Sequence, residues 1–162
     1  MKQGRFATDT SLAAFARRLR VLGYDVLVVP DATLERVCSV AAADGRIVLT
    51  LSRRVPRACA TAARRVVVRG LEDDALRSIV AEHAPGAAPF GRCTHCNALL
   101  GPPGSAAALA TAPVPPPVGV TVTGQCPGCR RCYWHGSHVD RLRTKLGAVL
   151  GREPSWPGAM GS

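Results

Sequence analysis

The chain has 162 residues, of which 47% are hydrophobic and 4% aromatic, so it can form one domain with a real core or a small domain plus a metal-stabilised module. Twenty-one basic residues, nineteen of them arginine, against eleven acidic ones give a net charge of +10. No apolar run approaches the roughly 20 residues that span a bilayer, and the first residues lack the pattern of a secretory signal. These features argue against a membrane protein and favour a cytoplasmic one.

The excess of positive charge favours a polyanionic partner, and nucleic acid is the leading class. The guanidinium group of arginine is a planar fork that pairs with phosphate and stacks on bases. High-GC codon usage would also explain the preference for arginine over lysine, but it does not explain the net charge.

Short apolar runs alternate with segments of helical periodicity through the first 83 residues. The runs predict strands at 5–8, 26–29, 47–50 and 66–68, and the periodic segments predict helices at 12–22, 33–43, 56–64 and 72–83. Strands that alternate with helices at this spacing form βαβ units, so we predict an α/β fold with a parallel sheet and helices on both faces. Sites in such sheets lie at the carboxyl ends of the strands.

Residues 85–91 are rich in proline and glycine and predict a linker, which separates an α/β domain at 1–84 from a second unit at 92–150. Residues 101–124 carry six prolines and predict a flexible or polyproline-like loop that leads into one strand. The apolar stripe of residues 139–149 predicts a final helix, with Ser137 as its cap and Asp140 in the capping-box position. Residues 151–162 are predicted to be a disordered tail.

Two Cys-x-x-Cys pairs, Cys93 with Cys96 and Cys126 with Cys129, predict a zinc ribbon, because each pair turns a knuckle that presents two thiolates to a tetrahedral ion. Four thiolates leave no open position, so the zinc would be structural. A redox dithiol is the competing interpretation, but the strand-to-helix placement that such a motif needs is absent. Three further residues could replace a ligand: Cys132, His95 and His138.

The other two cysteines, Cys38 and Cys59, occupy apolar positions in predicted helices and are expected to be small core residues. In a cytoplasmic protein, seven cysteines indicate metal binding rather than disulfides.

Three carboxylates are candidates for a catalytic magnesium or manganese site at the carboxyl edge of the sheet. Asp9 follows the first predicted strand, and Asp31 and Glu35 follow the second. Converging carboxylates bind such an ion, which holds a phosphate oxygen and activates water. The third strand instead ends in Thr50-Leu51-Ser52-Arg53, without an acid. Each carboxylate taken alone also fits a helix cap or a solvated surface group.

Basic and aromatic residues in two places are candidates for nucleic-acid binding. Arg53, Arg54 and Arg57 flank the carboxyl edge of the predicted sheet. A second set surrounds the second knuckle and suits phosphate contact and base stacking: Arg130, Arg131, Tyr133, His135 and Arg141. Tyr133 and the neighbouring Trp134 could instead pack the ribbon onto the α/β domain.

Three stretches together resemble the Mut-7 C-terminal RNase domain family over about residues 5–147. They are Arg5-Phe6-Ala7-Thr8-Asp9 continuing to Leu22-Gly23-Tyr24-Asp25, then Gly45-Arg46-Ile47-Val48-Leu49-Thr50, then Arg92-Cys93-x-x-Cys96-Asn97 with Cys126-Pro-x-Cys129 and Tyr133-Trp134-x-Gly136-Ser137-His138. The resemblance implies a PIN-like nuclease fold followed by a small zinc-ribbon module and a C-terminal helix. It also implies an RNA-directed protein whose acids hydrolyse phosphodiesters with magnesium or manganese.

The chain matches the catalytic acids of the family only in part. Asp9 matches the first acid of the family, but Ser52 stands where the family has an acid after the third strand, and the second acid falls at or beside Leu34. We therefore expect either a metal-dependent endoribonuclease with a degraded acidic site or a non-catalytic RNA-binding module. A protein-interaction scaffold that uses the proline-rich loop is a third hypothesis.

Overall fold

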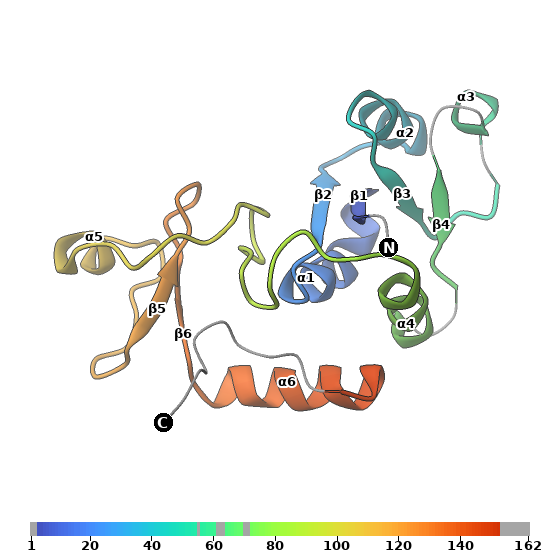
Figure 1. The fold of residues 1–162 in the computed structure, drawn as a ribbon. Coiled ribbons are helices and arrows are strands. Elements are labelled where there is room, and N and C mark those ends of the chain that lie inside the picture. The colour runs from blue at the N-terminus through green and yellow to red at the C-terminus, as the bar shows by residue number, and fades with distance from the viewer. Residues whose placement is uncertain (1–2, 55, 61–63, 70–71, 153–162) are drawn as a thin grey trace.

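A four-stranded parallel sheet forms the centre of the computed structural model, which describes residues 3–152 except 55, 61–63 and 70–71. Its strands run in the order β2-β1-β3-β4 (Figure 1). Their bounds are β1 Arg5–Asp9, β2 Asp25–Val29, β3 Ile47–Thr50 and β4 Arg65–Val67. All four residues of β3 are buried, as expected for an apolar strand inside a parallel sheet.

Helices cover both faces of the sheet, so the predicted α/β fold is confirmed. The first face carries α1 Ala13–Val21, α4 Glu72–Glu82 and α6 Ser137–Leu150, and the second carries α2 Leu34–Ala43 and α3 Arg57–Ala60. The alternation of side chains along each strand separates two cores: Phe6 packs with the first group of helices, and its neighbour Ala7 packs with the second. The short 3-10 helix η1 Thr10–Leu12 joins β1 to α1.

The ribbon is a separate two-stranded antiparallel sheet of β5 Val122–Gln125 and β6 Cys132–Trp134. The loop before it contains a short helix, α5 Ala106–Ala110, whose first turn is capped by the Ser105 hydroxyl. The prediction of a flexible or polyproline-like loop over residues 101–124 is therefore wrong at α5, because a serine cap and five residues dominated by alanine form a helical turn.

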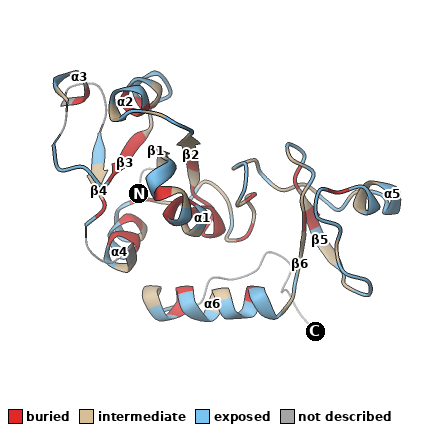
Figure 2. Ribbon diagram, turned by 180° about the vertical axis from the view of Figure 1, so that it is seen from behind, coloured by how far each residue is buried: buried red, intermediate tan, exposed pale blue. Residues whose placement is uncertain are grey.

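The C-terminal helix α6 returns from the ribbon to the α/β core. Its inner residues Val139 and Leu146 are buried in the same cluster as α1 and α4. Buried and exposed stretches alternate along α6 (Figure 2). Arg77 on α4 donates from Nε to the Val149 carbonyl at 2.8 Å. The predicted cap is wrong, because Gly136 precedes the helix and makes no side-chain capping bond. The predicted domain limits, 1–84 and 92–150, stay a prediction, and most of the predicted tail lies outside the described residues.

A turn at Gly23 brings the linker against α1. Gly23 has φ +89°, and a Cβ atom there would lie 2.1 Å from the Ala87 carbonyl oxygen. Only glycine fits this position, because a left-handed backbone and a close approach coincide. The predicted linker is thus held on the surface of the α/β core.

Cys38 on α2 and Cys59 on α3 are joined by a disulfide, with their Cα atoms 5.5 Å apart. Both are buried, as expected for core residues. The expectation that the cysteines serve metal binding rather than disulfides is wrong for this pair, because residues 21 positions apart meet where α3 packs on α2. Among the described helices, none is both long and apolar enough to cross a membrane.

Candidate functional site

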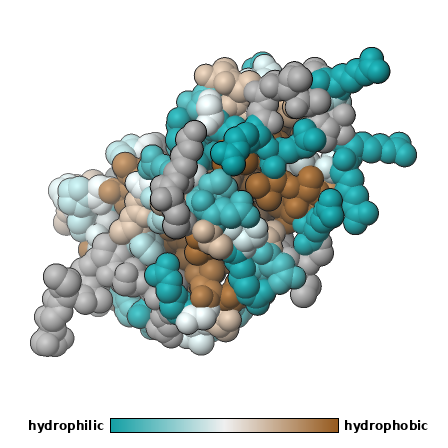
Figure 3. Space-filling view, turned by 45° about the vertical axis from the view of Figure 1, so that its right-hand side comes forward, coloured by the Kyte–Doolittle hydropathy of each residue, from teal (hydrophilic) through white to brown (hydrophobic). Residues whose placement is uncertain are grey.

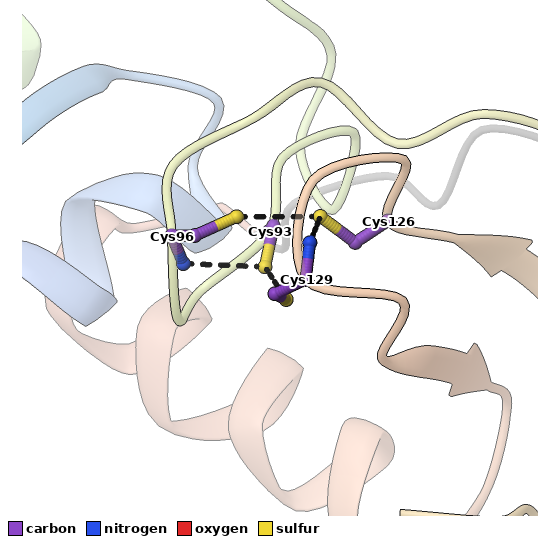
Figure 4. Close-up of side chains that lie close together, drawn as sticks. All are labelled: Cys93, Cys96, Cys126 and Cys129. Carbon is purple, nitrogen blue, oxygen red and sulfur yellow. Dashed lines mark hydrogen bonds between the residues drawn. The ribbon is translucent and has the colours of Figure 1, made fainter. Parts of the chain in front are cut away.

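The four predicted cysteine ligands converge between the two knuckles (Figure 4). Their sulfur atoms all lie within 4.8 Å of one another, with Cys93 3.6 Å from Cys129 and Cys96 3.3 Å from Cys126. Thiolates bound at about 2.3 Å around a tetrahedral zinc lie about 3.8 Å apart, so the donor set fits such an ion. Cys132, His95 and His138 are not part of this group.

The two knuckles have the same backbone geometry. The amide of Cys96 donates to the Cys93 sulfur at 3.3 Å, and that of Cys129 donates to the Cys126 sulfur at 3.4 Å. The residue after each second cysteine has a left-handed backbone, with φ 74° at Asn97 and φ 58° at Arg130. Such turns aim backbone N–H groups at the thiolates and so stabilise their negative charge.

Tyr133 also contacts the cysteine group. Its hydroxyl donates to the Cys93 sulfur at 3.0 Å and accepts from the Thr94 amide at 3.1 Å. Burial opposes ionisation of the Cys93 thiol, but the Cys96 amide and the Tyr133 hydroxyl lower its pKa to about 7. Burial raises the pKa of Cys126 to about 12 and also raises that of Tyr133. The hydroxyl of Tyr133 therefore stabilises the thiolate form of Cys93 in the four-cysteine group, a role that sequence reasoning missed.

The first knuckle is docked on the amino end of β2 by Arg20 and Asn97. The buried guanidinium of Arg20 donates to the carbonyls of Thr94 and His95, each at 2.9 Å, and to that of Val26. Asn97 accepts from the Val26 amide at 3.0 Å and donates to Asp25 at 2.7 Å. Burial lowers the pKa of Arg20, and the thiols of Cys93 and Cys96 oppose that shift. Arg20 thus places a positive charge beside the thiolates.

Asp25 joins this junction to two further arginines. Arg46 Nη1 lies 2.7 Å from Asp25 Oδ1, and Arg5 Nε lies 3.3 Å from Asp25 Oδ2. Burial alone would raise the pKa of Asp25, but hydrogen bonds from Arg46 and Asn97 lower it to about 2. A side chain that is 16% exposed thus remains ionised at the foot of the sheet.

The Asp25 network predicts a pH-dependent loss of stability in acid. The carboxyl titrates near 3.8 in the unfolded chain and near 2 in the folded one, so its contribution is complete above pH 4 and is lost as pH falls through 2. We expect up to about 2 kcal/mol, measured as the difference in unfolding free energy between wild type and Asp25→Asn at each pH. That difference should shrink between pH 4 and pH 2. A constant difference would contradict this role of Asp25.

The structure places the three candidate carboxylates around the carboxyl ends of β1 and β2. Asp9 ends β1 opposite Val29, Asp31 lies two residues beyond β2, and Glu35 lies in the first turn of α2. Asp9 caps η1 by accepting from the Ser11 amide at 2.7 Å and from the Ser11 hydroxyl. In the described part of the chain, these acids do not form a group of three ligands like that of the cysteines. Their catalytic role stays a prediction.

Ser52 has a local structural role at the end of β3. Its amide donates to the Thr50 hydroxyl at 3.0 Å, and its hydroxyl donates to the Arg54 carbonyl at 2.7 Å. Ser52 therefore shapes the turn that carries the arginines, and it supplies no negative charge to the edge of the sheet.

The predicted nucleic-acid residues fall into two separate sets. Arg53, Arg54 and Arg57 are exposed beyond the carboxyl end of β3. The second set lies at the ribbon and α6, on the side where the first knuckle meets the amino end of β2 (Figure 1). In that set Arg130, His135 and Arg141 are exposed, and Arg131 and Tyr133 are half-buried. The two sets therefore lie toward opposite ends of the parallel sheet.

Comparison with known families gives one match. The model of the Mut7-C RNAse domain matches residues 4–146, which is most of the 162-residue chain. No curated protein and no solved structure matches the chain. The matched region includes the whole parallel sheet, both knuckles and most of α6, and it contains Asp9, Arg20, Asn97 and the four clustered cysteines. With this match over the sheet and the cysteine group, the chain belongs to the Mut7-C RNAse domain family.

Proposed function

We propose that this protein binds RNA on a nuclease fold without assembling the carboxylate cluster that metal-dependent cleavage requires. The observation that carries the proposal is the edge beyond β3, where exposed Arg53 and Arg54 follow a serine in place of an acid. Arginines at this edge would pair with the phosphates of an RNA bound there. Figure 3 shows hydrophilic side chains that extend from one face of the molecule beside patches of apolar surface.

We further propose that the four clustered thiolates hold structural zinc. All four positions of a tetrahedral ion would be filled by protein sulfur, so the metal would bind no water or substrate. Its contribution would be to fix the two knuckles, and the RNA-binding residues Arg130 and Tyr133 with them. The proposed location is the cytoplasm.

The RNA proposal predicts salt-dependent binding that weakens when Arg53 and Arg54 are both replaced by alanine. Each lost phosphate contact lowers the slope of log affinity against log salt by about 0.7 for single strands, so the double variant should lose about 1.4. The measurement is fluorescence anisotropy of a labelled single-stranded RNA at several salt concentrations. A matched control replaces exposed Arg17 and Lys145, which removes the same charge elsewhere. Wild-type affinity that is absent or insensitive to salt would refute RNA binding.

A metal-dependent endoribonuclease is the second candidate, favoured by Asp9 at the carboxyl end of β1 and by the family match. Single-stranded and structured RNAs incubated with magnesium or manganese separate the two candidates. We expect no cleavage above that of a protein-free sample. Cleavage that is lost in Asp9→Asn would establish the nuclease and overturn the non-catalytic proposal, whereas cleavage unchanged in Asp9→Asn would not come from this site.

A further inference from the structure

A cavity of about 260 Å³ lies where α1, the linker, β6 and α6 meet. It is on the ribbon side of the molecule, away from the arginines that follow β3. The residues that carry the argument come from the segment after the linker, from β6 and from the first turns of α6: Arg92, Tyr133, Trp134, His138, Val139 and Leu142.

The lining combines apolar walls with aromatic rings. Val139 and Leu142 supply aliphatic surface, and Trp134 stacks edge-to-face on His138 with ring centroids 5.7 Å apart. Trp134 is half-buried and His138 is exposed, so the rings border the opening of the cavity rather than a closed core. This mixture suits a flat aromatic ligand, because every nucleobase has a π-face that stacks on such side chains.

Arg92 adds donor capacity to the wall. Its Nη1 donates to the Asn97 carbonyl at 2.8 Å, while its Nε is buried and has no hydrogen-bond partner among the described residues. A buried donor without an acceptor is unfavourable, and the ring nitrogens and carbonyl oxygens of a base are acceptors. Positive charge also flanks the lining in sequence, since Arg131 precedes Cys132 and exposed Arg141 precedes Leu142.

We propose that this cavity receives one unstacked base of a single-stranded RNA. The volume of about 260 Å³ falls below the roughly 300–1,000 Å³ of pockets for drug-sized ligands. The cavity therefore favours a single base over a larger ligand. The proposal rests on the proposed RNA binding and adds to it a contact with a base, which any of the four nucleobases could make. The arginines beside the lining would hold the phosphates on either side of the inserted base.

The test uses the emission of Trp134. Because the chain has two tryptophans, Trp156→Phe leaves Trp134 as the reporter. We expect single-stranded RNA to quench this emission to saturation, with the same midpoint as binding measured by anisotropy. Inorganic polyphosphate, which has the charge but no base, should compete for binding without quenching. Quenching by polyphosphate equal to that by RNA would overturn the pocket.

Substitutions of Trp134 provide the second measurement. Stacking of one base on an aromatic side chain corresponds to about 5- to 150-fold in affinity, so Trp134→Leu should weaken RNA binding within that range and leave the salt slope unchanged. Trp134→Phe, which keeps a stacking face, should recover most of the affinity. RNA binding by the wild type with full affinity in Trp134→Leu would overturn the pocket alone, whereas no RNA binding by the wild type would overturn the proposed function as well.

Discussion

Replacing Cys93 by serine is expected to abolish metal binding and to unfold the ribbon together with its contacts to the sheet. Structural zinc contributes about 10–16 kcal/mol to the folding of small metal modules, which exceeds the whole stability of many domains. The Cys93 sulfur also accepts hydrogen bonds from both the Cys96 amide and the Tyr133 hydroxyl. The measurement is zinc content per chain together with thermal unfolding, with and without a chelator.

Cys132→Ser is the matched control for this loss. Cys132 is buried like Cys93 and lies on β6, but it is outside the group of four sulfurs. We expect this variant to keep one zinc per chain and to unfold close to the wild-type temperature. One full equivalent of zinc in Cys93→Ser would show that another residue replaces the ligand and would contradict the assignment.

Arg20→Met is expected to destabilise the protein by about 3–5 kcal/mol, although Arg20 touches no proposed ligand. The substitution keeps an apolar stem but removes donors to the carbonyls of Val26, Thr94 and His95, which leaves polar groups unpaired at a buried junction. It also removes the positive charge beside the thiolates, so zinc affinity should fall. Urea unfolding and zinc titration measure the two effects.

The control for Arg20 is a neighbour on the same helix. Arg17 is exposed, so Arg17→Met changes the same charge without breaking the junction and should cost less than about 0.5 kcal/mol. Equal effects of the two substitutions would show that net charge, rather than the docking of the first knuckle, determines the loss.

The sequence predicted the elements of the sheet because local patterns determine them. The run Ile47–Thr50 is β3 with the same bounds. The helix predicted at 33–43 is α2 and begins one residue later, at Leu34, because Thr33 is its N-cap. The proline-rich loop was predicted to lead into one strand of the ribbon, and that strand is β5, which begins at Val122. The cap of α6 was mispredicted. Serine is a residue type that favours the N-cap position, but Ser137 is the first residue of the helix and Gly136 precedes it.

The four-cysteine group was predictable from the sequence, and the contacts that support it were not. Ligand spacing within each knuckle is a local signal, so four of the seven cysteines were assigned from the pattern alone. The docking of Asn97 on Asp25 and Val26 joins residues more than 70 positions apart, and no periodicity encodes such a contact. The Cys38–Cys59 disulfide needs the packing of α3 on α2 and was missed for the same reason.

The first knuckle is docked on the amino end of β2, so the two proposed RNA-binding sets are separated by at least the length of the sheet. This separation sets a minimum length for an RNA that contacts both sets. Arg53 and Arg54 lie beyond the opposite end of the sheet, and a five-residue strand such as β2 is about 16 Å long. A single RNA strand that contacts both proposed arginine sets would have to span at least this length. If the proposed RNA binding holds, fragments shorter than this would engage one arginine set at a time, and only longer RNAs would gain the avidity of both.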